Sequence, residues 1–321
     1  MGRRPVPARH ERHVPPDRQR RGNAPVITLR HHLLTIVAVF LALAAGIVLG
    51  GGPLSDVGPT VASAAKGDAP VATADQEQSD YTDAFLDSLA APVVGGRLAD
   101  RSVAVVTLPG ADEQLVTALA TRIGAAGGTI SGRYTVGDDL VDPGQKSLVD
   151  TLGSQLLTQQ ADGAVAPEAS TYDRIGQLLG LAVSTKEADG EGATGKTRAI
   201  ADAISGAGLL TLPEKADKRA PLVLLVLGTD ADDEGSDAIL AGLAEGLAAQ
   251  ATGVVVAGTV ADGTGQLGRL RGDPAAAGVA SVDGIDTTAG QVATVFTLGR
   301  SLTTPGGSFG AAGADGPVPL G

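Results

Sequence analysis

The sequence contains no cysteine, one methionine and four histidines, so it is poor in side chains that bind soft metal ions. Without cysteine the chain forms no disulfide and no thiolate metal site. The methionine is Met1, and the histidines are His10, His13, His31 and His32. Everything after residue 32 therefore lacks the imidazole, thiolate and thioether ligands that copper sites favour.

Aromatic residues are also scarce, with three tyrosines, four phenylalanines and no tryptophan in 321 residues. The core must then be built from Ala, Val and Leu, which bury less area per residue than aromatic side chains. No nucleophile, base and orienting group follow a recognisable catalytic order, so we predict neither an enzyme nor a bound cofactor. With a net charge of −12, we also expect no nucleic-acid partner.

One segment, residues 31–55, carries no formal charge and includes the apolar run LLTIVAVFLALAAGIVL at 33–49. As a helix, residues 33–52 rise about 30 Å, the thickness of a bilayer core. Residues 1–32 hold eight arginines against two acidic residues, whereas the remainder holds 16 Lys and Arg against 34 Asp and Glu. The positive-inside rule therefore predicts a basic cytoplasmic tail, a single-pass transmembrane helix at 33–52 and an extracytoplasmic remainder.

A cleaved signal peptide is the alternative, because it also combines a basic start with an apolar stretch. The small residues Ala62, Ser63 and Ala64 would then form the cleavage site, thirteen residues beyond Leu49. That distance is long for a peptidase at the membrane face, so we favour a retained anchor in the cell membrane.

Small residues mark one face of the predicted span, where Ala38, Ala42, Gly46 and Gly50 recur every four positions. Missing side chains at this spacing let two helix backbones approach closely. The pattern predicts a homo-oligomer or a partner membrane helix. An alanine-rich helix also meets this spacing by chance, and the sequence alone does not separate the two interpretations.

The run VITLRHHLLTIVAVFLALAAGIVLG, at 26–50, resembles the start of actinobacterial copper transport proteins of the MctB type. The stretches SVAVVTLPGAD at 102–112 and SVDGIDTTAGQVATVFTL at 281–298 are similar to this family as well. The resemblance extends from about residue 26 to 302. It implies a membrane-anchored, non-enzymatic copper transport or copper resistance protein of the cell envelope.

Two functions remain open at this point. One apolar helix cannot enclose a hydrophilic path, so copper transport would require several copies or another subunit. The alternative is an envelope or cell-division scaffold that docks a membrane partner without binding metal, since relatives in corynebacteria resemble such factors. We interpret His31 and His32 as interfacial anchors beside the apolar run rather than as copper ligands.

The true start of the chain is a separate hypothesis. Similar proteins usually start with Met where this chain has Val26, and a valine codon read as a start would make residues 1–25 an extension that is not translated. N-terminal peptide mass spectrometry tests this hypothesis. It predicts no peptides from residues 1–20, and their detection would contradict it.

Residues 53–95 are predicted to form a flexible stalk followed by a short helix. Gly, Pro, Ala, Ser and Thr dominate 51–74, whereas Tyr81, Phe85 and Leu89 repeat every four residues. The helix is expected to begin near Asp75 and to end before Pro92. At the other end of the chain, the Gly/Pro/Ala-rich residues 303–321 are expected to be disordered.

Residues 96–302 alternate short β-branched runs with longer helical patterns, which predicts an α/β domain with a doubly wound, mainly parallel sheet. The predicted strands are 103–107, 129–136, 221–227, 253–257 and 278–282. The predicted helices are 112–126, 143–160, 171–185, 197–205, 233–250 and 287–301.

Two glycine-rich segments match nucleotide-binding motifs. GEGATGKT at 190–197 matches a phosphate-binding loop, but residues of helical spacing precede it where a strand is required. GTGQLG at 263–268 matches a dinucleotide fingerprint, and we interpret it as a flexible loop.

The acidic run TDADDEGSD includes Asp230, Asp232, Asp233, Glu234 and Asp237. These carboxylates suit either a hard cation or the N-terminus of the following helix, and we favour helix capping by Asp232 or Asp233. Asp283 and Asp286 likewise follow a strand and precede a helix.

Overall fold

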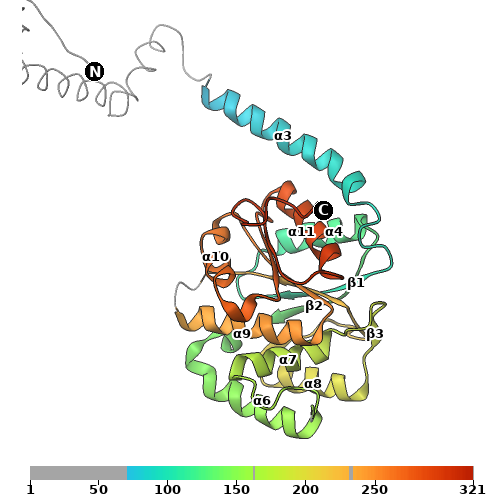
Figure 1. The fold of residues 1–321 in the computed structure, drawn as a ribbon, viewed down its shortest axis with the longest axis vertical. Coiled ribbons are helices and arrows are strands. Elements are labelled where there is room, and N and C mark those ends of the chain that lie inside the picture. Colours follow the sequence, from blue (N-terminus) through green and yellow to red (C-terminus); the bar gives the residue numbers. More distant parts are fainter. Residues whose placement is uncertain (1–70, 162, 231–233, 321) are drawn as a thin grey trace, which may run out of the picture. The chain divides into compact units, whose positions relative to one another are not determined.

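The computed structural model describes residues 71–161, 163–230 and 234–320 (Figure 1). The predicted span at 33–52 and its packing residues Ala38, Ala42, Gly46 and Gly50 lie outside these ranges. Within them, no helix combines the length and the apolar character needed to cross a membrane. Residues Asp75–Gly321 form one unit of structure, and the description below concerns that unit.

A seven-stranded sheet lies at the centre of this unit, in the order β4-β2-β1-β6-β7-β8-β9. All neighbouring strands are parallel except β2 and β4, which are antiparallel, so the predicted mainly parallel sheet is confirmed. The strands are β1 (Ser102–Thr107), β2 (Thr129–Val136), β4 (Leu210–Thr211), β6 (Leu222–Val226), β7 (Gly253–Gly258), β8 (Ala280–Asp283) and β9 (Ser308–Phe309). A separate antiparallel ribbon pairs β3 (Glu191–Gly192) with β5 (Lys218–Arg219).

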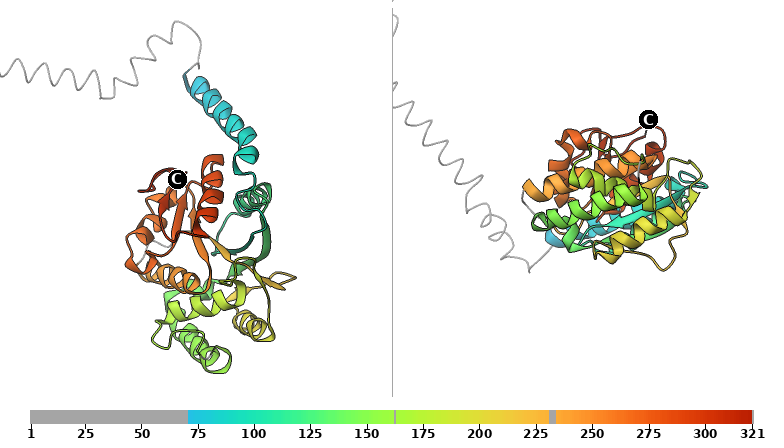
Figure 2. Two further views of the ribbon diagram at one scale, coloured as in Figure 1. Left: turned by 45° about the vertical axis from the view of Figure 1, so that its right-hand side comes forward. Right: turned by 90° about the horizontal axis from the view of Figure 1, so that it is seen from below.

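Helices cover both faces of the sheet (Figure 1, and from other sides Figure 2). One face carries α4 (Glu113–Ala125) and α11 (Thr288–Ser301), together with the end of α3 (Val71–Val94). The other face carries α5 (Asp138–Val141), α6 (Lys146–Gln160), α7 (Thr171–Val183), α8 (Gly195–Gly206) and α9 (Glu234–Gln250). Shorter helices are η1 (Pro143–Gln145), η2 (Ala261–Gly263), α10 (Gln266–Arg271) and η3 (Pro274–Ala276).

The two helix layers explain why the central strands are continuously apolar. In β1, Val103 and Val105 pack toward α4 and α11, whereas Ala104 and Val106 pack toward the other layer. Successive side chains of a strand point to opposite faces, so a strand covered on both sides must be apolar at every position. The same holds for β6, in which all five residues are buried.

Helices α7 and α9 pack against each other through glycines. Each helix has two glycines four residues apart, Gly176 and Gly180 in α7 and Gly242 and Gly246 in α9. A Cβ atom at Gly246 would lie 2.3 Å from the carbonyl oxygen of Asp173, and one at Gly176 would lie 2.7 Å from that of Leu243. The two helices therefore approach until backbone meets backbone.

Helix α3 continues past the point at which we expected it to end. The prediction of an end before Pro92 is wrong, because α3 extends to Val94 with Pro92 inside its last turn. Because Pro92 has no backbone N–H, the carbonyl oxygen of Ser88 loses its helical hydrogen bond. Ser88 is exposed, so water can hydrogen-bond to this oxygen instead. Burial of Ala90 and Val94, at 1% and 0% exposure, holds the last turn against the domain.

The C-terminal segment is ordered, so the prediction of a disordered tail is wrong for residues 303–320. Strand β9 pairs in parallel with β8, and Phe309 is 3% exposed. The guanidinium of Arg271 donates to Asp283 and to the carbonyl of Phe309, at 2.7 Å each, and Ala312 N donates to Asp283 at 2.9 Å. Composition suggested disorder, but a buried ion pair binds this segment to the sheet.

The segment 263–268 is not the flexible loop that we expected, because α10 begins at Gln266. Leu267 and Leu270 lie on its buried side, at 0% and 4% exposure. Two leucines three residues apart were the signal for this short helix, and the glycines around them masked it.

Candidate functional site

A pocket of about 290 Å³ lies at the carboxyl ends of β1 and β6. These strands are neighbours in the sheet, yet the chain continues from β1 to β2 on one side and from β6 to β7 on the other. The loops that follow such a pair diverge and leave a crevice, which is where open α/β sheets bind ligands. The topology therefore selects this pocket as the candidate site.

The loop that follows β1 is in close contact with the loop that follows β6. Thr229 N donates to the carbonyl oxygen of Pro109 at 3.0 Å. A Cβ atom at Gly228 would lie 1.8 Å from that same oxygen, and one at Gly110 would lie 2.2 Å from Thr229 Oγ1. Gly110 also has a φ of 81°, in the left-handed region that glycine adopts without strain. Both glycines are needed for the loops to meet.

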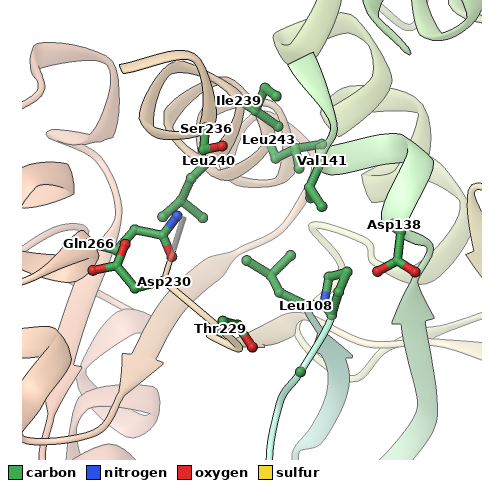
Figure 3. A pocket seen from close by; sticks show the side chains of 12 residues that line it. Leu108, Asp138, Val141, Thr229, Asp230, Ser236, Ile239, Leu240, Leu243 and Gln266 are labelled. Carbon is green, nitrogen blue, oxygen red and sulfur yellow. The ribbon is translucent and has the colours of Figure 1, made fainter. Parts of the chain in front are cut away.

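The pocket wall is mostly apolar, with carboxylates at two sides (Figure 3). Leu108 comes from the loop after β1, and Val141 comes from α5. Asp138 and Asp230 enter from opposite sides of the pocket. Helix α9 contributes Ser236, Ile239, Leu240 and Leu243, and α10 contributes Gln266.

Asp230 belongs to an ion-pair network. Arg269 donates through Nη2 to Asp230 Oδ1 and through Nε to Asp237 Oδ2, both at 2.7 Å. These hydrogen bonds, that to Asp237 first, raise the pKa of Arg269 above its ordinary value. Asp230 is therefore held in place by a cation and is not available as a strong metal ligand.

The lining suits a small, partly apolar molecule rather than a metal ion. In the part of the chain that the structure describes, no group of three or more His, Cys, Asp or Glu side chains is arranged to hold a metal. The pocket is lined by apolar side chains, hydroxyls, an amide and two carboxylates, and soft or borderline metals prefer sulfur and imidazole ligands.

Among the acidic residues of the run at 229–237, only some lie in the described part of the chain. Asp230 and Asp237 meet at Arg269, whereas Asp232 and Asp233 lie outside the described residues, so capping of α9 by either stays a prediction. Helix α11 is capped by Thr287, whose side chain accepts from Gly290 N, and not by an aspartate.

Asp283 and Asp286 also have structural contacts. Asp283 is fully buried against Arg271, and Asp286 accepts from Val260 N at 2.8 Å.

The glycine motif at 190–197 lacks the strand that a phosphate-binding loop requires, in agreement with the sequence. Within the motif, Glu191 and Gly192 form β3, a two-residue strand of the side ribbon, and Gly195 already begins α8. No strand of the main sheet leads into this loop among the described residues. Thr194 and Thr197 form a capping box at the start of α8. A phosphate-binding loop requires a sheet strand directly before it.

The comparisons with known proteins agree with the resemblance noted above. Residues 26–319 match the family described as "Copper transport outer membrane protein, MctB". The chain belongs to the MctB family. The curated Copper transporter MctB of Mycobacterium bovis is 28% identical over 304 residues, which cover 85% of this chain and 92% of that protein. The relatives in Mycobacterium tuberculosis and Mycobacterium leprae are also 28% identical, with the same coverage.

The MctB match extends beyond the part that we recognised from motifs. The resemblance recognised from motifs reached only to about Leu302. The family match continues to residue 319 and so includes β9. The C-terminal segment is thus part of the family domain, as its place in the sheet requires.

The pocket between β1 and β6 was not predicted from the sequence. Its signal was present in the chain, because two apolar strands are each followed by a loop that contains glycine, at 108–110 and 228–230. What the sequence did not reveal is that β1 and β6, more than 100 residues apart, are neighbours.

Proposed function

We propose that this chain is a membrane-anchored, non-enzymatic component of copper transport or copper resistance in the cell envelope. Family membership carries this proposal, because relatives named copper transporter MctB align over 92% of their own length. The anchor is the predicted span at 33–52, with residues 1–32 in the cytoplasm and the α/β domain outside.

The proposal gives the α/β domain a role other than holding copper. Residues 33–321 contain no His, Cys or Met, so the domain has no ligand set that copper favours. One apolar helix cannot enclose a path either, so copper would cross through an assembly of copies or with a partner membrane protein. Ala38, Ala42, Gly46 and Gly50 provide the predicted packing face of that assembly.

Deletion of the gene in its host tests the copper role. We expect copper hypersensitivity and raised cellular copper, measured by elemental mass spectrometry, and we expect both to be restored by the full chain. Zinc tolerance and cellular zinc are the matched control and should not change. Normal copper tolerance and normal cellular copper in the deletion strain would contradict the proposal.

An envelope or cell-division scaffold is the second candidate, and the missing copper ligands after residue 32 are the observation that favours it. In that case, purification from detergent should recover a stoichiometric membrane partner whether or not copper is present. Recovery of the homogeneous chain alone would count against the scaffold.

A further inference from the structure

Helix α3 has a row of large apolar side chains exposed to solvent. Tyr81, Phe85, Leu89 and Val93 follow one another every four residues and are 70%, 49%, 41% and 47% exposed. The rings of Tyr81 and Phe85 stack, with 6.3 Å between their centroids. Residues four apart are neighbours on a helix surface, so these four side chains form a continuous strip.

This exposure is unusual in a chain with so few aromatic residues. The other aromatic side chains of the described residues are all buried, at 1% to 9% exposure. They are Tyr134, Tyr172, Phe296 and Phe309. Isolated exposed apolar residues are ordinary, but a continuous exposed strip with two aromatics indicates a binding surface.

An apolar groove of about 240 Å³ adjoins this strip. Leu86, Leu89, Ala90 and Val93 form its α3 side. The opposite side is formed by Thr288, Ala289 and Val292 of α11 and by Pro317 and Val318 of the C-terminal segment. We call the four exposed residues and this groove together the α3 surface. Its lining is apolar, as in grooves that receive the apolar side of a helix.

The charge of α3 indicates which kind of molecule binds the α3 surface. From 71 to 94 the helix contains five acidic residues and no Lys or Arg. A second copy would bring two acidic helices together, and like charges at a helix pair destabilise it. An anionic membrane surface would also repel this helix, since helices that bind such surfaces carry Lys and Arg on their polar side.

We propose that the α3 surface binds an amphipathic helix of a partner protein, with apolar residues toward the groove and Lys or Arg along its edges. Tyr81 and Phe85 are the anchors, because large aromatic side chains contribute most when an interface desolvates them. Asp83 lies three residues before Leu86, beside the groove on the helix surface, and provides the acidic edge.

The position of the α3 surface in the chain limits how far from the membrane the partner's helix can lie. This limit rests on the proposed function, in which residues 33–52 are the membrane anchor. Only residues 53–70 separate that span from the helix, and they reach at most about 65 Å when fully extended. Tyr81 lies ten residues further along α3, which adds about 15 Å. The partner's basic helix should therefore reach Tyr81 within about 80 Å of the external face of the cell membrane.

Photo-crosslinking in living cells tests the proposal on the full chain. Benzoylphenylalanine is introduced in place of Tyr81, and in a matched control in place of Leu148, which is 40% exposed on α6. We expect Tyr81 to cross-link to another protein and the control not to do so. Mass spectrometry of the cross-linked peptide should identify a basic amphipathic helix.

Surface variants then separate specific binding from chance contact. Phe85→Ser and Asp83→Lys should each reduce the cross-link at position 81 at least tenfold. The matched changes Leu148→Ser and Asp202→Lys, at exposed residues of α6 and α8, should leave it unchanged. Thermal unfolding of each variant should match the parent, because these side chains lie at the surface.

Several outcomes would overturn the proposal. Cross-links to a second copy of the chain would assign the surface to self-association, and cross-links to lipid alone would assign it to the membrane. No cross-link above the Leu148 control, or a cross-linked peptide without basic residues, would also contradict it.

Cellular copper, measured in the same Phe85→Ser strain, keeps this proposal separate from the copper function. If the cross-link is lost while cellular copper stays normal, the surface binds a partner that the copper role does not need. If the cross-link forms but deletion leaves cellular copper normal, the copper function fails and the surface stands.

Discussion

Replacing Gly246 by alanine is expected to destabilise the domain, although the same replacement at Gly124 should stabilise it. A Cβ atom at Gly246 would lie 2.3 Å from Asp173 O and 2.5 Å from Gln177 N, both backbone atoms of α7. Backbone cannot rotate away as a side chain does, so the two helices must separate. Overpacking of this kind costs about 1–3 kcal/mol, and separation would also disturb the core between α7 and α9.

Gly124 is the control because it lies in the exposed part of α4, where an added Cβ atom would meet no atom within 4 Å outside its own helix. There, alanine only reduces the freedom of the unfolded chain, which stabilises by about 0.4–1 kcal/mol. Thermal unfolding followed by circular dichroism should therefore shift in opposite directions for the two variants. Equal shifts would show that the α7–α9 contact does not depend on glycine.

Replacing Asp283 by asparagine is expected to release the C-terminal segment and to lower the free energy of unfolding by about 3–5 kcal/mol, the cost of breaking a buried ion pair. Asp283 is fully buried, and Arg271 Nη2 donates to its Oδ1 while Ala312 N donates to its Oδ2. An asparagine keeps one oxygen only, so its amide group must face a donor, either Arg271 or Ala312 N.

Chymotrypsin provides a direct measurement of this release. Phe309 is the aromatic residue of the C-terminal segment, and at 3% exposure it is protected in the parent. Cleavage after Phe309 should become fast in Asp283→Asn under native conditions. The pair Arg198 and Asp217, 52% and 73% exposed, is the control, and Asp217→Asn should change stability by less than about 1 kcal/mol. Continued protection of Phe309 in Asp283→Asn would contradict this account.

The secondary structure was largely predictable because it depends on local patterns. The run from Leu222 to Val226 is apolar at every position, which indicates a strand covered on both faces. Helix α4 repeats Leu115, Leu119 and Ile123 on one face, which is the period of a helix packed on one side. Both elements form within a residue or two of the predicted ends.

The errors share a physical cause, which is that distant contacts decided the outcome. Gly, Pro and Ala favour disorder when nothing holds them, yet Arg271 and Asp283 hold the segment around Phe309. Proline ends most helices, yet burial of Val94 keeps the last turn of α3 in place. Neither contact can be predicted from the neighbouring residues in the sequence.

Composition and local patterns were enough to predict the α/β class, most element boundaries and the resemblance to the MctB family, and they show that soft metal ligands are absent after residue 32. Those features follow from composition and from periods of two to four residues, which a strand or helix expresses locally. The folded chain was needed to reveal the pocket between β1 and β6, the glycine contact of α7 and α9, and the exposure of Tyr81 and Phe85. Each depends on which distant segments meet, because burial is a property of the folded chain and not of a residue type.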